Sequence, residues 1–153
     1  EGNPHAMEFP RAKVGGSAYD FSFSGMKSAV LNYINQAQMK GEEICVPDLA
    51  ASFQNAVVDV LVSRAVAAAK EYGYDKLAIA GGVASNSALR AGMKAACEKE
   101  GIRFYYPSPI FCTDNAAMIA VAGYIAYTHG VRGDFDLTAD PGIELEAAAV
   151  SHV

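Results

Sequence analysis

The stretch LAIAGGVASNSALRAGMKAACEKEGIRFYY, residues 77–106, decides the fold. Its first four residues are apolar, too few for a helix and bounded by turn signals, which predicts a buried strand. The pair Gly81-Gly82 follows, then a helix over about 86–100 and a second strand over 102–106. Because strands joined through a helix pair in parallel, the sequence predicts an α/β layer.

Helical periodicity predicts three further helices around this unit. They run from Ser24 to Gly41, from Pro47 to Gly73, and from a Thr113 cap to His129. The last of these helices lies within the uncharged stretch 115–131 and is predicted to be buried. A short strand is also predicted through 19–23. Two or three strands are few for a sheet with four helices. We therefore expect an α/β fold with an incomplete sheet and about four helices. The first residue, Glu1, also suggests a part of a longer domain.

The composition is that of one globular domain. Of the 153 residues, 52% are hydrophobic and 19% charged, so the chain is not disordered. The 12 Lys and Arg against 17 Asp and Glu give a net charge of −5, which argues against this chain binding nucleic acid by itself. We see no signal peptide or membrane span. Three cysteines without a CxxC favour a reducing cytoplasm over disulfides or a zinc knuckle.

Four residues, Gly81, Gly82, Asn86 and Asp114, are candidates for ligand contact, and each has a structural alternative. Gly81 and Gly82 follow a strand, where α/β folds bind ligands, but they also suit a tight turn. Asn86 could direct its amide at a ligand or cap the helix. Asp114 could bind a metal or face the same cleft, or complement a helix dipole. Arg90 is predicted to be a solvated surface charge.

Several other kinds of site are not supported by the sequence. The histidines His5, His129 and His152 have no HxxxH or HExxH spacing, so they cannot complete a metal site. His129 is predicted to cap the end of a helix. There is no GxSxG, and the stretch from Ser24 to Lys27 lacks the upstream glycine of a phosphate-binding loop.

Three segments together resemble one protein family. They are DFSFSGMK at 20–27, AGGVASNSALR at 80–90 and FCTDNAAMI at 111–119. In order and spacing they are similar to the bacterial TsaD family, the tRNA adenosine threonylcarbamoyltransferases, formerly called glycoproteases or O-sialoglycoprotein endopeptidases. The GNP and FPR motifs near the start also fit, and the resemblance extends to about Leu145.

The resemblance implies a fold and a division of the chain. The family has the actin, sugar-kinase and Hsp70-like (ASKHA, ribonuclease H-like) fold, in which two α/β lobes enclose a nucleotide cleft. It implies that residues 1–145 are a partial C-terminal lobe and that 146–153 form a tail. The two metal-binding histidines of the family's HxxxH motif have no counterpart in this sequence.

The resemblance also implies roles for the candidate residues. Asn86 matches the asparagine that contacts the adenylate substrate, and Gly81 and Gly82 match the turn against that nucleotide. Asp114 matches a ligand of one divalent metal, iron or zinc, which it would share with the two absent histidines.

The implied reaction moves the threonylcarbamoyl group from threonylcarbamoyl-adenylate to the exocyclic amine of the adenosine next to the anticodon of tRNA. AMP is the leaving group. The implied partners are tRNA, TsaB-like and TsaE-like proteins and the synthetase that supplies the adenylate, in the cytoplasm and without a membrane. We expect the chain alone to be inactive and to self-associate.

Three alternatives remain open. The chain alone could be a non-catalytic module that binds nucleotide or a partner protein, which the absent histidines favour. A glycoprotease needs a nucleophile–base pair or a complete zinc motif, and the sequence offers neither. A kinase of the same superfamily would carry other motifs.

Overall fold

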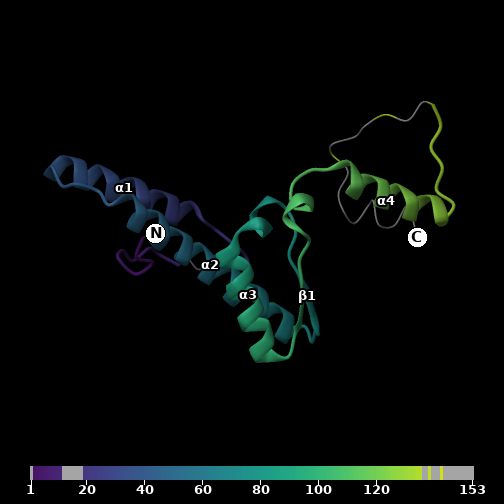
Figure 1. Ribbon diagram of the computed structural model, residues 1–153, viewed down its shortest axis with the longest axis horizontal. Helices are drawn as coiled ribbons and strands as arrows, with labels where there is room; N and C mark the ends of the chain where they lie inside the picture. The colour runs from purple at the N-terminus through teal and green to yellow at the C-terminus, as the bar shows by residue number, and fades with distance from the viewer. Residues whose placement is uncertain (1, 12–18, 136–137, 139–141, 143–153) are drawn as a thin grey trace. The chain divides into compact units, whose positions relative to one another are not determined.

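The computed structural model describes residues 2–11, 19–135, 138 and 142, in two compact units, 1–112 and 113–153. The described residues form the predicted α/β fold, with four α-helices and a two-stranded parallel sheet. The tail predicted for 146–153 lies outside the described residues. The first unit contains α1 (Ser24–Lys40), α2 (Val46–Glu71), β1 (Lys76–Ala78), the 3₁₀ helix η1 (Gly82–Ser85), α3 (Ser87–Glu100), β2 (Arg103–Tyr105) and the 3₁₀ helix η2 (Pro109–Phe111), and the second contains α4 (Ala116–Thr128) (Figure 1).

The two strands pair in parallel, and α3 connects them. Their register places Lys76 opposite Arg103 and Ala78 opposite Tyr105. The N–H of Ile79 extends the pairing by donating to the carbonyl oxygen of Tyr105 at 3.0 Å. This arrangement confirms the strand–helix–strand unit predicted from the sequence.

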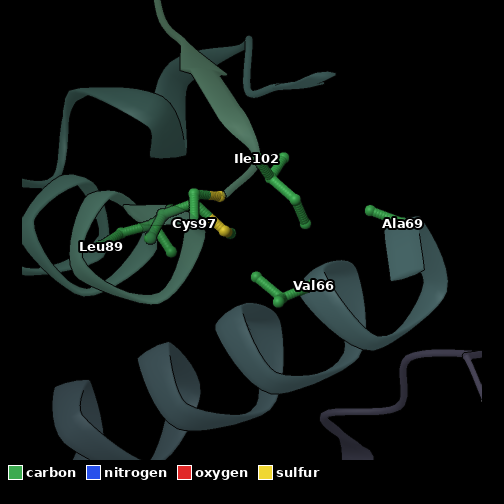
Figure 2. Close-up of a cluster of buried hydrophobic side chains, with 6 residues drawn as sticks. Val66, Ala69, Leu89, Cys97 and Ile102 are labelled. Atoms are coloured by element: carbon green, nitrogen blue, oxygen red, sulfur yellow. The ribbon is translucent and has the colours of Figure 1, made fainter. Parts of the chain in front are cut away.

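Helix α3 packs against α2 through a cluster of buried side chains. Leu89, Met93 and Cys97 recur at every fourth residue, so they lie on one face of α3. A Cβ built at Gly92 would lie 3.3 Å from Cγ1 of Val58, so glycine lets the two helices approach closely. The cluster consists of Val66, Ala69, Leu89, Met93, Cys97 and Ile102 (Figure 2).

Helix α1 and the N-terminal segment pack against the earlier part of α2. A second buried cluster joins Phe9 and Met26 to Ala56 and Val60. Met26 and Ala37 are the buried residues of α1. Their spacing equals about three helical turns, which confirms the single apolar face predicted for this helix.

Hydrogen bonds hold the N-terminal segment along α2. The buried hydroxyl of Ser52 donates to the carbonyl oxygen of Asn3 at 3.1 Å and accepts from the N–H of Met7 at 3.2 Å. The N–H of Asn3 donates to the Asp48 carboxylate at 2.7 Å. This bond lowers the pKa of Asp48. Residues 2–11 are therefore attached to α2 by polar as well as apolar contacts.

Helix α2 forms part of both clusters. By length and composition it is the one helix, among the described residues, that could cross a membrane. Its buried residues, however, contact α1 and α3. Asp59 near its centre forms an ion pair with Arg11, with Nη2 2.5 Å from Oδ2, and Arg64 donates to the carbonyl oxygen of Asp20. In this structure α2 is a core helix.

The ends of the helices lie close to the predicted positions. Gly41 and Gly101 follow α1 and α3 with φ values of +68° and +70°. Gly73 lies just beyond α2, also with φ +70°. These are left-handed conformations that favour glycine, so the glycines end the helices as the sequence predicts.

Two predictions about strands are wrong. Residues 19–23 form no strand, because no described strand lies beside them to pair with. The sheet is also less buried than predicted. Leu77 and Phe104 pack on the cluster between α2 and α3, whereas the alternate residues, such as Ala78 and Tyr105, are exposed. Within the part of the chain that the structure describes, helices cover one face of the sheet and leave the other exposed.

The last helix differs from the prediction at its start and in its burial. Asn115, not Thr113, caps α4, because its Oδ1 accepts from the N–H of Met118 at 3.0 Å. His129 ends the helix as predicted, with its N–H 3.2 Å from the carbonyl oxygen of Ile125. No residue of α4 is buried, since it is the one helix of its unit within the described residues.

Replacing Met93 by alanine should lower the free energy of unfolding by about 2–5 kcal/mol, because it leaves a cavity between α2 and α3. Met93 is 2% exposed. Lys94→Ala is the matched control, because Lys94 is an exposed neighbour on the same helix, and it should change this free energy by less than about 0.5 kcal/mol. Urea unfolding followed by circular dichroism measures both. An equal loss of unfolding free energy in the Met93→Ala and Lys94→Ala variants would contradict the packing described for α3.

The chain of 153 residues should self-associate, because large apolar side chains are exposed on the sheet and on α4. Tyr105 is 49% exposed and Ile119 is 66% exposed. Sedimentation velocity over a range of concentrations would show the association as a rising sedimentation coefficient. A monomer at every concentration would contradict this expectation.

Candidate functional site

The glycine pair lies directly after β1 and has open space beside it. Gly81 has φ +83°, a conformation that favours glycine, and Gly82 begins η1. A Cβ at either position would meet no atom within 4 Å. A ligand could therefore approach this backbone closely. The sequence predicts a direct turn into α3, and the structure adds the 3₁₀ turn of η1 between the glycines and that helix.

Asn86 caps α3 and also contacts α2. Its Oδ1 accepts from the N–H of Leu89 at 2.9 Å, which confirms the capping alternative. Its Nδ2 donates to Oε1 of Gln54 at 2.9 Å. These two bonds fix the orientation of the amide. Because an amide nitrogen carries two N–H groups and the oxygen two lone pairs, Asn86 keeps the capacity to bind a ligand.

An open pocket of about 240 Å³ lies between α2 and the start of α3. Most of its lining is apolar, and its polar groups are the two side-chain amides that bond to each other, those of Gln54 and Asn86. A mostly apolar wall with few convergent polar groups is typical of ligand sites. The lining residues are Phe53, Gln54, Val57, Val58, Leu61, Val83, Asn86 and Leu89.

Sequence reasoning misses Gln54. It is an exposed residue of α2, and its partner Asn86 is 32 residues further along the chain. A polar residue beside the apolar positions of a helix is the one local signal, and it does not indicate a partner. The contact becomes visible only when α3 lies against α2.

Arg90 is not the solvated surface charge that the sequence predicts. Its Nε donates to the carbonyl oxygen of Ala84 in η1, and its Nη2 donates to the carbonyl oxygen of Pro107 at 3.0 Å. The same nitrogen lies 3.2 Å from Sγ of the buried Cys112. The guanidinium carbon lies 4.7 Å from the centroid of the Tyr106 ring. The side chain is half-buried, and its guanidinium contacts backbone carbonyls, a sulfur and an aromatic ring.

Asp114 belongs to the second unit, whereas Gly81, Gly82 and Asn86 belong to the first. It is exposed and lies just before Asn115, the cap of α4, so it is outside the first turn of that helix. The alternative in which it complements the helix dipole from within that turn is therefore wrong. The structure brings the two glycines and Asn86 into one loop and describes Asp114 separately.

The residues that the structure describes do not form a metal site. Among them, no group of three or more His, Cys, Asp or Glu side chains lies close enough together to hold a metal ion. The ring Nδ1 of His129 is 2.9 Å from the carbonyl oxygen of Ile125, so the ring contacts the last turn of α4. Asp114 could supply one ligand, but iron and zinc in proteins need at least three protein ligands. The described residues therefore do not fit the implied metal.

Comparison with known families shows which family the chain belongs to. The family model described as "TsaD: tRNA N6-adenosine threonylcarbamoyltransferase" matches residues 1–121. The chain belongs to the TsaD family. The match includes all three segments that carry the resemblance, at 20–27, 80–90 and 111–119.

Several curated relatives have the name tRNA N6-adenosine threonylcarbamoyltransferase. The protein of Clostridioides difficile (strain 630) is 53% identical over 144 residues, which cover 94% of this chain and 43% of the relative. That of Desulfitobacterium hafniense (strain Y51) is 54% identical over 145 residues, covering 95% and 42%. A Clostridium botulinum (strain Hall) protein is 53% identical, covering 95% and 43%. This TsaD-family chain therefore spans less than half the length of these relatives.

Variants of Asn86 should separate its capping role from its contact with Gln54. Asn86→Ala should lower the free energy of unfolding by about 1 kcal/mol, because the N–H of Leu89 loses its acceptor. Asn86→Asp keeps an acceptor at the cap and should be nearly as stable as the wild type. Thermal and urea unfolding measure both. Equal destabilisation by the two variants would contradict the capping geometry.

Proposed function

We propose that this chain is part of an enzyme that transfers the threonylcarbamoyl group from threonylcarbamoyl-adenylate to tRNA. The acceptor is the exocyclic amine of the adenosine next to the anticodon. The proposal is supported by one feature above all: the open Gly81-Gly82 backbone and the capping Asn86 lie within a segment that matches the TsaD family. The names of the relatives agree with it.

The proposed reaction is an acyl-type substitution at the carbamoyl carbon. The amine nitrogen attacks this carbon, a nitrogen–carbon bond forms, and the bond from carbon to the phosphate oxygen breaks. AMP leaves with the electron pair, and the amine loses a proton to solvent or to a base. The residues of this chain bind and orient the nucleotide in this scheme. We assign none of them as the nucleophile or the base.

The glycine loop and Asn86 have complementary parts in nucleotide binding. The absence of side chains at Gly81 and Gly82 lets the ribose or phosphate of the adenylate approach the backbone. Asn86, which Leu89 and Gln54 hold in one orientation, directs its remaining N–H at the nucleotide. The neighbouring apolar pocket can exclude water from one side of the ligand.

The fold and partners of the longer enzyme belong to the same proposal. Residues 1–145 would be a partial C-terminal lobe of an ASKHA fold, which agrees with a two-stranded sheet that is open on one face. The partners would be tRNA, TsaB-like and TsaE-like proteins and the adenylate synthetase, in the cytoplasm. Asp114 is the one candidate ligand for the implied iron or zinc ion among the described residues, so the proposed reaction has no step that uses the metal.

A second function is a non-catalytic module that binds nucleotide or a partner protein. One observation favours it for the chain by itself: the described residues supply a glycine loop and a pocket but no group of metal ligands. An assay of the transfer reaction separates the two functions. The enzyme forms threonylcarbamoyladenosine, whereas the binding module forms none.

The test uses a full-length chimaera, in which this chain replaces the segment of the Clostridioides difficile relative that it matches. The chimaera is incubated with the synthetase, the partner proteins, ATP, threonine, bicarbonate and unmodified tRNA. Nucleoside mass spectrometry then measures threonylcarbamoyladenosine. We expect product from the chimaera. A folded chimaera that forms none, while the unaltered relative is active, would contradict the proposed function.

The Asn86→Asp variant of the chimaera should form product at least about tenfold more slowly. It removes the N–H donor and places a carboxylate near the anionic adenylate, where like charges repel. Asn32→Asp is the matched control, since it makes the same change at an exposed position of α1 and should leave the rate unchanged. A full rate in Asn86→Asp would exclude Asn86 from nucleotide binding.

A further inference from the structure

Arg90 connects the two loops at the carboxyl ends of the strands. We name these the β1 loop, 79–86, and the β2 loop, 106–112. The guanidinium bonds to the carbonyl oxygen of Ala84 in the first loop and to that of Pro107 in the second. In a parallel sheet the carboxyl ends of neighbouring strands meet at one edge, where ligands bind. One side chain of α3 therefore fixes the spacing of both loops at this edge.

The partners of Arg90 are neutral. They are two carbonyl oxygens, the sulfur of Cys112 and the face of Tyr106. None of the five ion pairs between described residues includes Arg90. No carboxylate among the described residues therefore forms an ion pair with Arg90. Its positive charge also stays uncompensated by these partners, which favours an anionic ligand nearby.

The contact with Ala84 acts directly on the glycine loop. Ala84 is buried, and it lies midway between Gly82 and Asn86 in the sequence. Its N–H donates to the carbonyl oxygen of Gly81 at 3.0 Å, which closes the 3₁₀ turn. Arg90 binds the carbonyl of the same residue. Arg90 therefore bonds directly to the 3₁₀ turn that lies between Gly81 and Asn86.

We propose that Arg90 is a positioning residue for the adenylate. By joining the β1 loop to the β2 loop, it holds Gly81, Gly82 and Asn86 in the arrangement that receives the nucleotide. The inference rests on the proposed function, because it takes the ligand to be an adenylate. Lysine cannot replace it, since one ammonium on a flexible stem cannot bond to carbonyls in two loops and stack on Tyr106 at the same time.

The experiment measures AMP binding and steady-state kinetics in the full-length chimaera and its variants. Arg90→Met removes the donors, and Arg90→Lys keeps the charge without the planar fork. Arg103→Gln is the matched control. It also removes an arginine of the first unit, but one at the start of β2 that pairs with Asp75. Isothermal titration calorimetry gives the dissociation constant of AMP, and kinetics give KM for threonylcarbamoyl-adenylate separately from kcat.

Both Arg90 variants should raise the dissociation constant of AMP and KM by about tenfold or more, as expected when bonds from a charged donor are lost. The kcat value should change by less than about threefold, because no reacting atom is removed. Arg103→Gln should leave the dissociation constant of AMP, KM and kcat unchanged. Wild-type affinity in Arg90→Lys would overturn the proposal, since charge alone would then suffice. Wild-type affinity in Arg90→Met would overturn it as well.

Two further outcomes separate this inference from the proposed function. A wild-type chimaera that binds AMP but forms no product contradicts the proposed function and leaves the Arg90 test valid. A wild-type chimaera that does not bind AMP overturns both. If Arg90→Met does not fold, the AMP affinity of Arg90→Lys alone tests the proposal. If neither variant folds, as judged by circular dichroism and Tm, Arg90 is a determinant of the fold and the positioning role is overturned.

Discussion

The close contact between α2 and α3 is the interaction on which the rest of the first unit depends. Gly92 allows the two helices to approach, and Met93 and Cys97 fill the space between them. Because α3 is also the connection between β1 and β2, its position on α2 sets where both strands begin and end. The sheet packs on the same cluster through Leu77 and Phe104, so its place on the helices depends on this contact.

The candidate site uses the first turn of α3 in three ways. Asn86 caps the helix and contacts α2, Leu89 enters the buried cluster, and Arg90 reaches the loops after both strands. Candidate binding groups and core groups thus alternate within a few residues of one helix. A TsaD-family segment with this arrangement can hold a glycine-containing loop in a defined shape while the two glycines stay exposed.

The regular elements could be predicted from the sequence because their signals are local. Gly101 ends α3, and the spacing of apolar residues defines the helix faces. The roles of Gln54 and Arg90 could not be predicted. The partner of Gln54 lies 32 residues away, and Arg90 contacts backbone carbonyls, which carry no side-chain signal. The sequence predicts Thr113 as the cap of α4, but Thr and Asn are both good caps, so the pattern does not show that Asn115 is the cap. The family resemblance supplied the ligand chemistry, which no spacing within the chain could indicate.

The adjacency of Leu89 and Arg90 has a consequence for motion. One side chain is buried in the core, and the next holds the two loops, so the loops cannot separate widely without displacing the turn that anchors the helix. Amide protons of the β1 loop and of α3 should therefore exchange with deuterium as one cooperative unit, although the loop residues are exposed. Loops are commonly the first parts of a protein to open, whereas the opening free energy of this loop is expected to approach that of the helix.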